Sequence, residues 1–112
     1  METINHKISG TLSTKILSAA KTVGDEPTMT ICNINNTECD VSVFYSKENY
    51  AVDSNGDEAN STEIFFVLKS FNVPNNKTMT LDKTDMSFNN EGFDLYIQLG
   101  TSGEAVDVII TI

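Results

Sequence analysis

The sequence predicts an all-β fold, an antiparallel β-sandwich of immunoglobulin-like or jelly-roll-like type. Apolar and polar residues alternate in several short runs, which places one side of each strand on a core and the other in water. Short clusters rich in Asn, Gly, Pro and Asp separate these runs and predict turns. The length of 112 residues suits one domain. We therefore expect a single sandwich domain over residues 14–112, preceded by an N-terminal arm over residues 1–13.

The N-terminal segment has the least regular pattern. Ile8, Leu12 and Ile16 fall at helical spacing, but the Ser and Thr residues between them favour extended structure. We predict an extended arm that is followed by a strand near residues 14–20.

Four alternating runs, at residues 29–33, 41–45, 93–99 and 106–112, predict the strands that build the core. A polar turn lies between the first two runs, which we interpret as a hairpin. Pairing Ile31 with Val41 puts the apolar side chains of this hairpin on one face. In that register Cys32 and Cys39 leave opposite faces, so we predict two free thiols. The predicted core consists of Met29, Ile31, Val41, Val43, Phe66, Leu68, Leu95, Ile97, Val106, Val108 and Ile110.

Residues 64–68 read Ile-Phe-Phe-Val-Leu and do not alternate. A strand that is apolar on both sides is usually buried on both sides. Two interpretations are open: a local cover, such as the N-terminal segment, or an interface with another subunit. For such an interface we predict the residues Ile4, Ile8, Phe65, Val67, Phe71, Ile109 and Ile112.

The composition of residues 47–63 predicts one long loop, which carries five carboxylates and one Lys. Within it, Asp53, Asn55 and Asp57 are the only candidate cation ligands that we single out. An EF-hand calcium loop requires Gly at its sixth position, whereas Gly56 is fourth in this segment. We therefore predict a solvated loop and no metal site, with a cation-dependent module that holds a hard cation weakly at these three oxygen donors as the alternative.

The sequence offers no convergent set of catalytic groups. His6 is the only histidine, and we find no Gly-rich phosphate loop and no nucleophile motif. We expect a protein that is not an enzyme, with no catalytic residues and no cofactor.

The charge balance bears on the partners. Sixteen acidic residues against seven Lys give a formal net charge of −9. Nucleic acids and anionic membranes need a basic surface, so we expect neither as a partner. No apolar run approaches the ~20 residues of a membrane span, and the first residues do not resemble a secretory signal.

Three segments together resemble small virion structural proteins of tailed bacteriophages, especially those of marine bacteria and cyanobacteria. The first is residues 28–33 with the run at 41–43, the second is residues 71–81, and the third is residues 93–112. The resemblance covers the chain from about residue 27 to its end. It implies a sandwich that assembles on a particle, as a capsid decoration or cement protein or in the neck, tail or fibre attachment. It further implies major capsid or neck and tail proteins and further copies of the chain as partners. Location in the virion, after synthesis in the host bacterial cytoplasm, follows from the same resemblance.

An alternative function is a host-surface glycan-binding adhesion module of a phage fibre. In it, Tyr45, Tyr50 or Tyr96 would stack on a sugar ring. The absence of Trp and an aromatic share of 8% count against this alternative.

Overall fold

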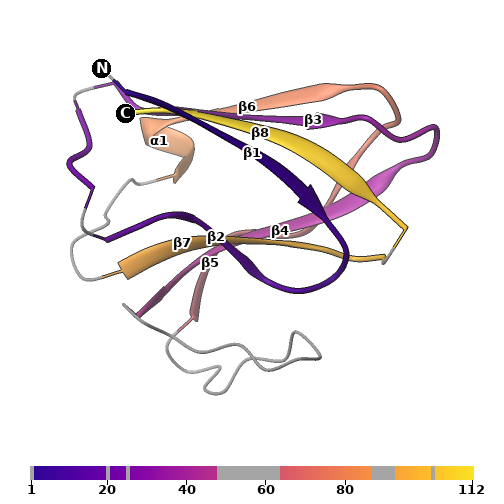
Figure 1. Ribbon diagram of the computed structural model, residues 1–112, viewed down its shortest axis with the longest axis horizontal. Coiled ribbons are helices and arrows are strands. Elements are labelled where there is room, and N and C mark those ends of the chain that lie inside the picture. Colours follow the sequence, from indigo (N-terminus) through magenta and orange to yellow (C-terminus); the bar gives the residue numbers. More distant parts are fainter. Residues whose placement is uncertain (1, 20, 25, 48–63, 87–92, 102) are drawn as a thin grey trace.

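Two four-stranded antiparallel sheets pack in a sandwich-like arrangement in the computed structural model (Figure 1). The structure describes residues 2–19, 21–24, 26–47, 64–86, 93–101 and 103–112. The elements within these residues are β1 (Thr3–Ser9), β2 (Thr14–Leu17), β3 (Thr28–Asn33), β4 (Cys39–Lys47), β5 (Ile64–Val73), β6 (Thr78–Asp82), α1 (Lys83–Met86), β7 (Phe93–Leu99) and β8 (Ala105–Thr111). The prediction of an all-β chain built from antiparallel sheets is confirmed.

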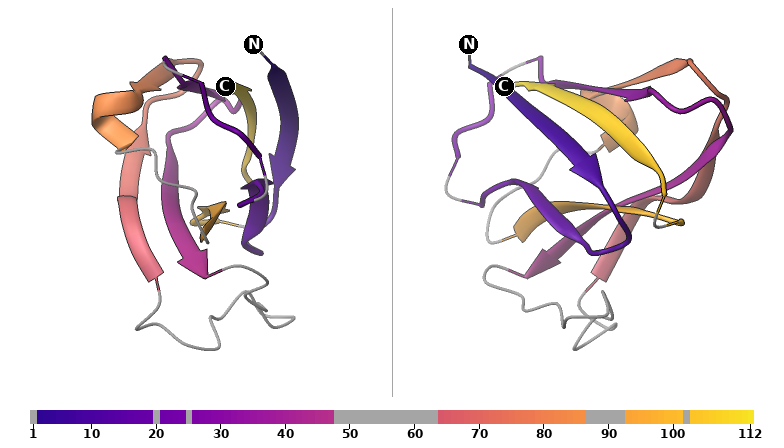
Figure 2. Two further views of the ribbon diagram at one scale, coloured as in Figure 1. Left: turned by 90° about the vertical axis from the view of Figure 1, so that its left-hand side faces the viewer. Right: turned by 45° about the vertical axis from the view of Figure 1, so that its right-hand side comes forward.

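The strand order is β1-β8-β3-β6 in the first sheet and β2-β7-β4-β5 in the second. The first four strands thus pair with the last four in reverse order, as β1 with β8, β2 with β7, β3 with β6 and β4 with β5. The strands β1 and β5 lie at opposite flanks of the molecule (Figure 2).

The core lies between the two sheets and is built from the inward-facing residues of the alternating runs. Every predicted core residue is buried except Phe66, which is 45% exposed, and Leu68, which is half-buried. Both exceptions lie in β5, where the alternation fails. The alternating pattern therefore identified the buried side of β3, β4, β7 and β8 correctly.

The predicted hairpin between β3 and β4 is wrong. Ile31 pairs with Val108 of β8, and Val41 pairs with Leu99 of β7, so the two strands belong to different sheets. Both strands do turn their apolar sides to one core, but they do so from opposite layers. Alternation determines which side of a strand is buried and leaves open which sheet the strand joins.

The two cysteines are free thiols that lie in different sheets. Cys32 of β3 is half-buried and Cys39 of β4 is fully buried. The predicted pair of free thiols thus agrees with the structure, although the register from which it was argued does not.

The predicted N-terminal arm is extended, and residues 3–9 of it form an edge strand of the first sheet. This strand, β1, pairs with β8 along its whole length. Ile8 is buried, and His6 occupies the inward position before it, where its Nε2 donates to the Ile16 carbonyl over 2.9 Å. A polar ring at an inward position obscures the alternation, which explains why the sequence predicted an arm. The strand expected near residues 14–20 is present as β2.

The chain ends of the first sheet lie side by side (Figure 1). The backbone N–H of Glu2 donates to the Ile112 carbonyl, and that of Ile112 donates to the Glu2 carbonyl, both over 2.9 Å. Ile112 is buried, so it belongs to the core.

The short helix α1 follows β6 and begins with a capping box. The backbone N–H groups of Thr84 and Asp85 donate to Asp82 Oδ1 over 2.9 and 3.0 Å, and Asp85 Oδ2 accepts from the Asp82 N–H over 3.0 Å. The hydrogen bond from Asp85 is the largest cause that lowers the pKa of the Asp82 carboxyl. The described residues contain no helix with the length and apolar composition that crossing a bilayer requires.

Candidate functional site

The strand β5 is an irregular edge strand, and this explains its apolar run. Among the described strands it pairs only with β4, and the register shifts twice, between Val41 and Val43 and between Val43 and Phe44. Each shift inserts one extra residue in β5, as in a β-bulge, and Ser70 in the first bulge has a φ of 51°. The bulges change which face successive residues occupy. The run at 64–68 therefore carries apolar residues on both faces without being a strand buried on both sides.

Three phenylalanines of the edge strand β5 are exposed, and we call them together the β5 apolar surface. Phe66 lies on the outer face with its partner Phe44, whereas Phe65 and Phe71 pair with the core residues Tyr45 and Val41 and lie on the other face. Phe65, Phe66 and Phe71 are 56%, 45% and 46% exposed. Phe66 packs against Phe44, and Phe65 meets Phe93 edge to face, with ring centroids 5.5 and 5.6 Å apart. These contacts hold two of the three exposed rings in place. Exposed apolar patches of this kind tend to mark contacts with other proteins.

The seven predicted interface residues do not form one surface. Phe65 and Phe71 are exposed and Val67 is half-buried on β5, whereas Ile109 is exposed on the outer face of the other sheet. Ile4 is half-buried, and Ile8 and Ile112 belong to the core. The N-terminal segment does not cover β5, because β1 lies at the opposite flank (Figure 2). Phe65, Val67 and Phe71 share the strand β5, and the other four lie elsewhere.

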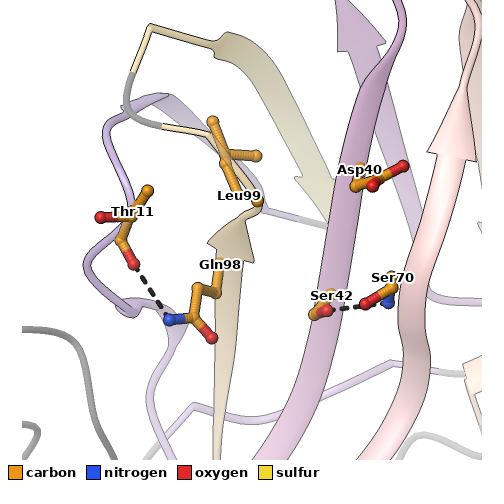
Figure 3. Close-up of a pocket in the computed structure, with 7 residues that line it drawn as sticks. Thr11, Asp40, Ser42, Ser70, Gln98 and Leu99 are labelled. Carbon is orange, nitrogen blue, oxygen red and sulfur yellow. Dashed lines mark hydrogen bonds between the residues drawn. The ribbon is translucent and has the colours of Figure 1, made fainter.

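A second surface feature is a hollow of about 400 Å³ on the outer face of the second sheet (Figure 3). We call it the polar hollow, and its lining residues are Thr11, Asp40, Ser42, Ser70, Gln98, Leu99 and Gly100. The neighbouring strands β4, β5 and β7 supply most of these residues, and the connection between β1 and β2 supplies Thr11.

Hydrogen bonds orient the polar groups of Gln98 and Ser42 in the polar hollow. The side-chain amide of Gln98 donates to the Thr11 carbonyl over 3.0 Å, and the backbone N–H of Ser70 donates to Ser42 Oγ over 2.9 Å (Figure 3). Ser42 and Gln98 are direct partners in the register of β4 and β7. The polar groups therefore project from adjacent strands at defined positions.

Asp40 is the charged residue of the polar hollow, and two neighbours hold it in place. The Asn72 amide donates to Asp40 Oδ1 over 3.3 Å, and the Gly100 N–H donates to the Asp40 carbonyl over 3.0 Å. A Cβ at Gly100 would lie 3.1 Å from Asp40 Cβ and 3.9 Å from Asp40 Oδ2. The absence of a side chain at Gly100 leaves this flank of the carboxylate open.

The tyrosines that the sequence suggests for sugar stacking are not accessible in the described part of the chain. Tyr45 and Tyr96 are 8% and 4% exposed, and Tyr96 stacks on the buried ring of Phe44 with centroids 5.5 Å apart. Tyr50 lies outside the described residues. A platform made of Tyr45 and Tyr96 therefore does not exist on this surface.

The candidate cation ligands Asp53, Asn55 and Asp57 also lie outside the described residues, as does most of the predicted acidic loop. Within the part of the chain that the structure describes, no three metal-ligating side chains come together.

The polar hollow is not among the sites that the sequence predicted. The sequence contained a signal for it, because Asp40 and Ser42 alternate with buried residues of β4. Gln98 in β7 and Gly100 directly after that strand flank the buried Leu99 in the same way. Two such strands converge on one site only if they pair, and the predicted hairpin assigned β4 to the wrong partner.

No protein-family model, no curated protein and no solved structure matches this chain.

Proposed function

We propose that the chain is a non-enzymatic structural component of a tailed-phage virion. It decorates the capsid or joins the neck, tail or fibre attachment, and its partners are other virion proteins and further copies of itself. The observation that carries this proposal is the β5 apolar surface, on which one strand exposes Phe65, Phe66 and Phe71. The resemblance of residues 28–43, 71–81 and 93–112 to phage virion proteins supplies the kind of particle.

We also propose that the sandwich is of the jelly-roll type. In a jelly roll, a long antiparallel hairpin of eight strands is rolled into two sheets, and viral capsid domains use this architecture. The pairing of β1, β2, β3 and β4 with β8, β7, β6 and β5 supports this assignment. It is the pairing expected when one long hairpin, with β4 and β5 at its tip, folds over on itself.

The β5 apolar surface binds its partner through side-chain packing. Burial of apolar area contributes about 25 cal/mol per Å². The two bulges interrupt the regular row of backbone groups at the edge of β5, and bulges of this kind oppose open-ended strand pairing. The net charge of −9 keeps free copies apart and favours docking on a surface of complementary charge.

Mass spectrometry of phage particles purified by density gradient tests the proposal. The chain is expected in the particles, at high copy number if it covers the shell and at low copy number if it joins the neck or tail. Its absence from intact particles would contradict the proposal.

A pair of phage variants tests the surface. Phe71→Ser removes one exposed ring from the β5 apolar surface and is expected to lower the amount of chain in the particle severalfold. Leu12→Ser is the matched control, because Leu12 is equally exposed, at 48%, beside β2 at the opposite edge of the second sheet. Equal incorporation of both variants would assign assembly to another surface.

A further inference from the structure

We propose that the polar hollow binds a neutral saccharide. This inference goes beyond assembly and does not depend on the β5 apolar surface. It rests on the lining of the hollow, its charge and its preformed geometry (Figure 3).

The lining suits a ligand with several hydroxyl groups. Thr11, Ser42 and Ser70 carry hydroxyls, Gln98 a carboxamide and Asp40 a carboxylate. Hydroxyl, carboxamide and carboxylate groups are of the kinds that form hydrogen bonds with alcohols, and a few convergent polar groups are what orients a small ligand in a pocket. Gly100 carries no side chain, so its backbone can lie against the C–H groups of a sugar ring.

The hydrogen bonds inside the hollow leave a donor and an acceptor at defined places. Ser42 Oγ accepts from the Ser70 N–H, so its own hydroxyl proton can point to a ligand. The Asn72 amide orients Asp40 through Oδ1, and Oδ2 lies at the open flank beside Gly100. Asp40 and Ser42 are alternate residues of β4, roughly 6.8 Å apart along the strand. Two hydroxyls of one sugar ring can bridge such a pair.

The charge of the hollow selects against anionic ligands. None of the described residues that line it is cationic, and Asp40 contributes a negative charge. A phosphate or a sugar acid would meet this carboxylate without a counter-ion and within the field of a chain of net charge −9. The ligand class that fits is therefore the neutral saccharides.

Amide chemical shifts of the isotope-labelled chain test this inference. The probes are glucose, galactose, mannose and N-acetylglucosamine at millimolar concentrations. At least one of them is expected to shift the amide signals of Thr11, Ser42, Ser70, Gln98 and Gly100 saturably. Glucuronate, the anionic arm, is expected to bind at least about tenfold more weakly than the sugar that binds best, because it adds a charge that faces Asp40.

Two variants, each of which removes one negative charge, make the test more specific. Asp40→Asn retains the shape of the side chain but removes the charged acceptor, and we expect it to weaken binding about tenfold. Glu38→Gln, at a neighbouring exposed acid outside the hollow, is expected to bind like the parent chain. Melting curves that match the parent chain show that both variants are folded.

Four results would overturn the inference. These are no shift with any of the four sugars, shifts that map outside the hollow, equal affinity of Asp40→Asn and the parent chain, and equal affinity for glucuronate and the sugar that binds best. None of these results bears on incorporation into particles, so this inference and the proposed function stand or fall separately.

Discussion

Asn33 joins three segments of the chain through its buried side chain. Its Nδ2 donates to the carbonyls of Thr37, Val73 and Pro74 over 3.0, 2.9 and 3.2 Å, and its Oδ1 accepts from the Asn35 N–H over 2.9 Å. Two of these partners are about forty residues away in the sequence, at the end of β5 and in the turn that follows it. The sequence identified Asn33 only as the end of a strand, because long-range bonds of a side chain leave no local pattern.

Removing this amide should destabilise the fold. We expect Asn33→Ala to lower the free energy of unfolding by about 2 to 3 kcal/mol, since it removes the donor of three carbonyls, among them the buried carbonyl of Val73. Urea unfolding measures the effect, provided that the dependence of the unfolding free energy on urea concentration is unchanged. Asn36→Ala, at an exposed neighbour, is the control and should change the stability by no more than about 0.5 kcal/mol. Equal stability of the two variants would show that the amide contributes little.

The two thiols should differ in reactivity. Burial, a hydrogen bond with Glu104 and the charges of Glu104 and Asp40 raise the pKa of Cys39 to about 12 from its ordinary value of 9.0. At pH 8 a disulfide reagent such as DTNB should therefore modify the half-buried Cys32 in the folded protein and Cys39 only after unfolding.

The same pKa shift has a consequence for stability. The unfolded thiol ionises near pH 9, whereas the folded thiol stays protonated until about pH 12. The stability that the protonated form contributes is complete below pH 9 and declines as the pH rises toward 12.

Cys32→Ser is the control for the reactivity of the two thiols toward DTNB, since it should abolish the modification seen in the folded protein. Equal rates for both thiols in the folded protein would contradict the assignment.

Among the elements, the regular strands were predictable and the irregular ones were not. The runs at 29–33, 41–45, 93–99 and 106–112 alternate over most of their length and correspond to β3, β4, β7 and β8. In β5 the inserted residues break the two-residue period, so the pattern suggested burial on both faces where the chain forms an edge. A bulge depends on the partner strand, and one strand's sequence does not specify it.

The first bulge of β5 offers a test at Ser70. With a φ of 51°, this residue occupies a region that β-branched residues strongly disfavour. Ser70→Val should therefore destabilise the protein by about 1 to 2 kcal/mol, and Ser70→Gly should leave it unchanged or slightly more stable. Thermal unfolding followed by circular dichroism distinguishes the two. A Val variant as stable as the Gly variant would mean that β5 pairs with β4 without this bulge.

At the scale of the whole molecule, the pairing of the strands and the polar hollow could not be predicted from the sequence, for one reason. Alternation assigned the buried sides, but the mutual pairing of the two halves of the chain brings together residues that are far apart in sequence. Asp40 and Gly100 meet in the polar hollow only because β4 pairs with β7. The exposed phenylalanines of β5 were visible in the sequence, whereas the burial of Ile8 and Ile112 followed from pairing at the chain ends.

Two properties of the whole molecule oppose each other, and salt changes their balance. The charge of −9 makes copies repel, while the β5 apolar surface favours contact. Salt screens the repulsion over a Debye length of about 10 Å at 0.1 M and leaves the apolar attraction in place. Sedimentation velocity should therefore show monomers at low salt and a growing share of oligomers as sodium chloride is added. Phe71→Ser should reduce the oligomers severalfold and Leu12→Ser should not. Association that weakens in salt would show that charge pairs, rather than the phenylalanines of β5, hold copies together.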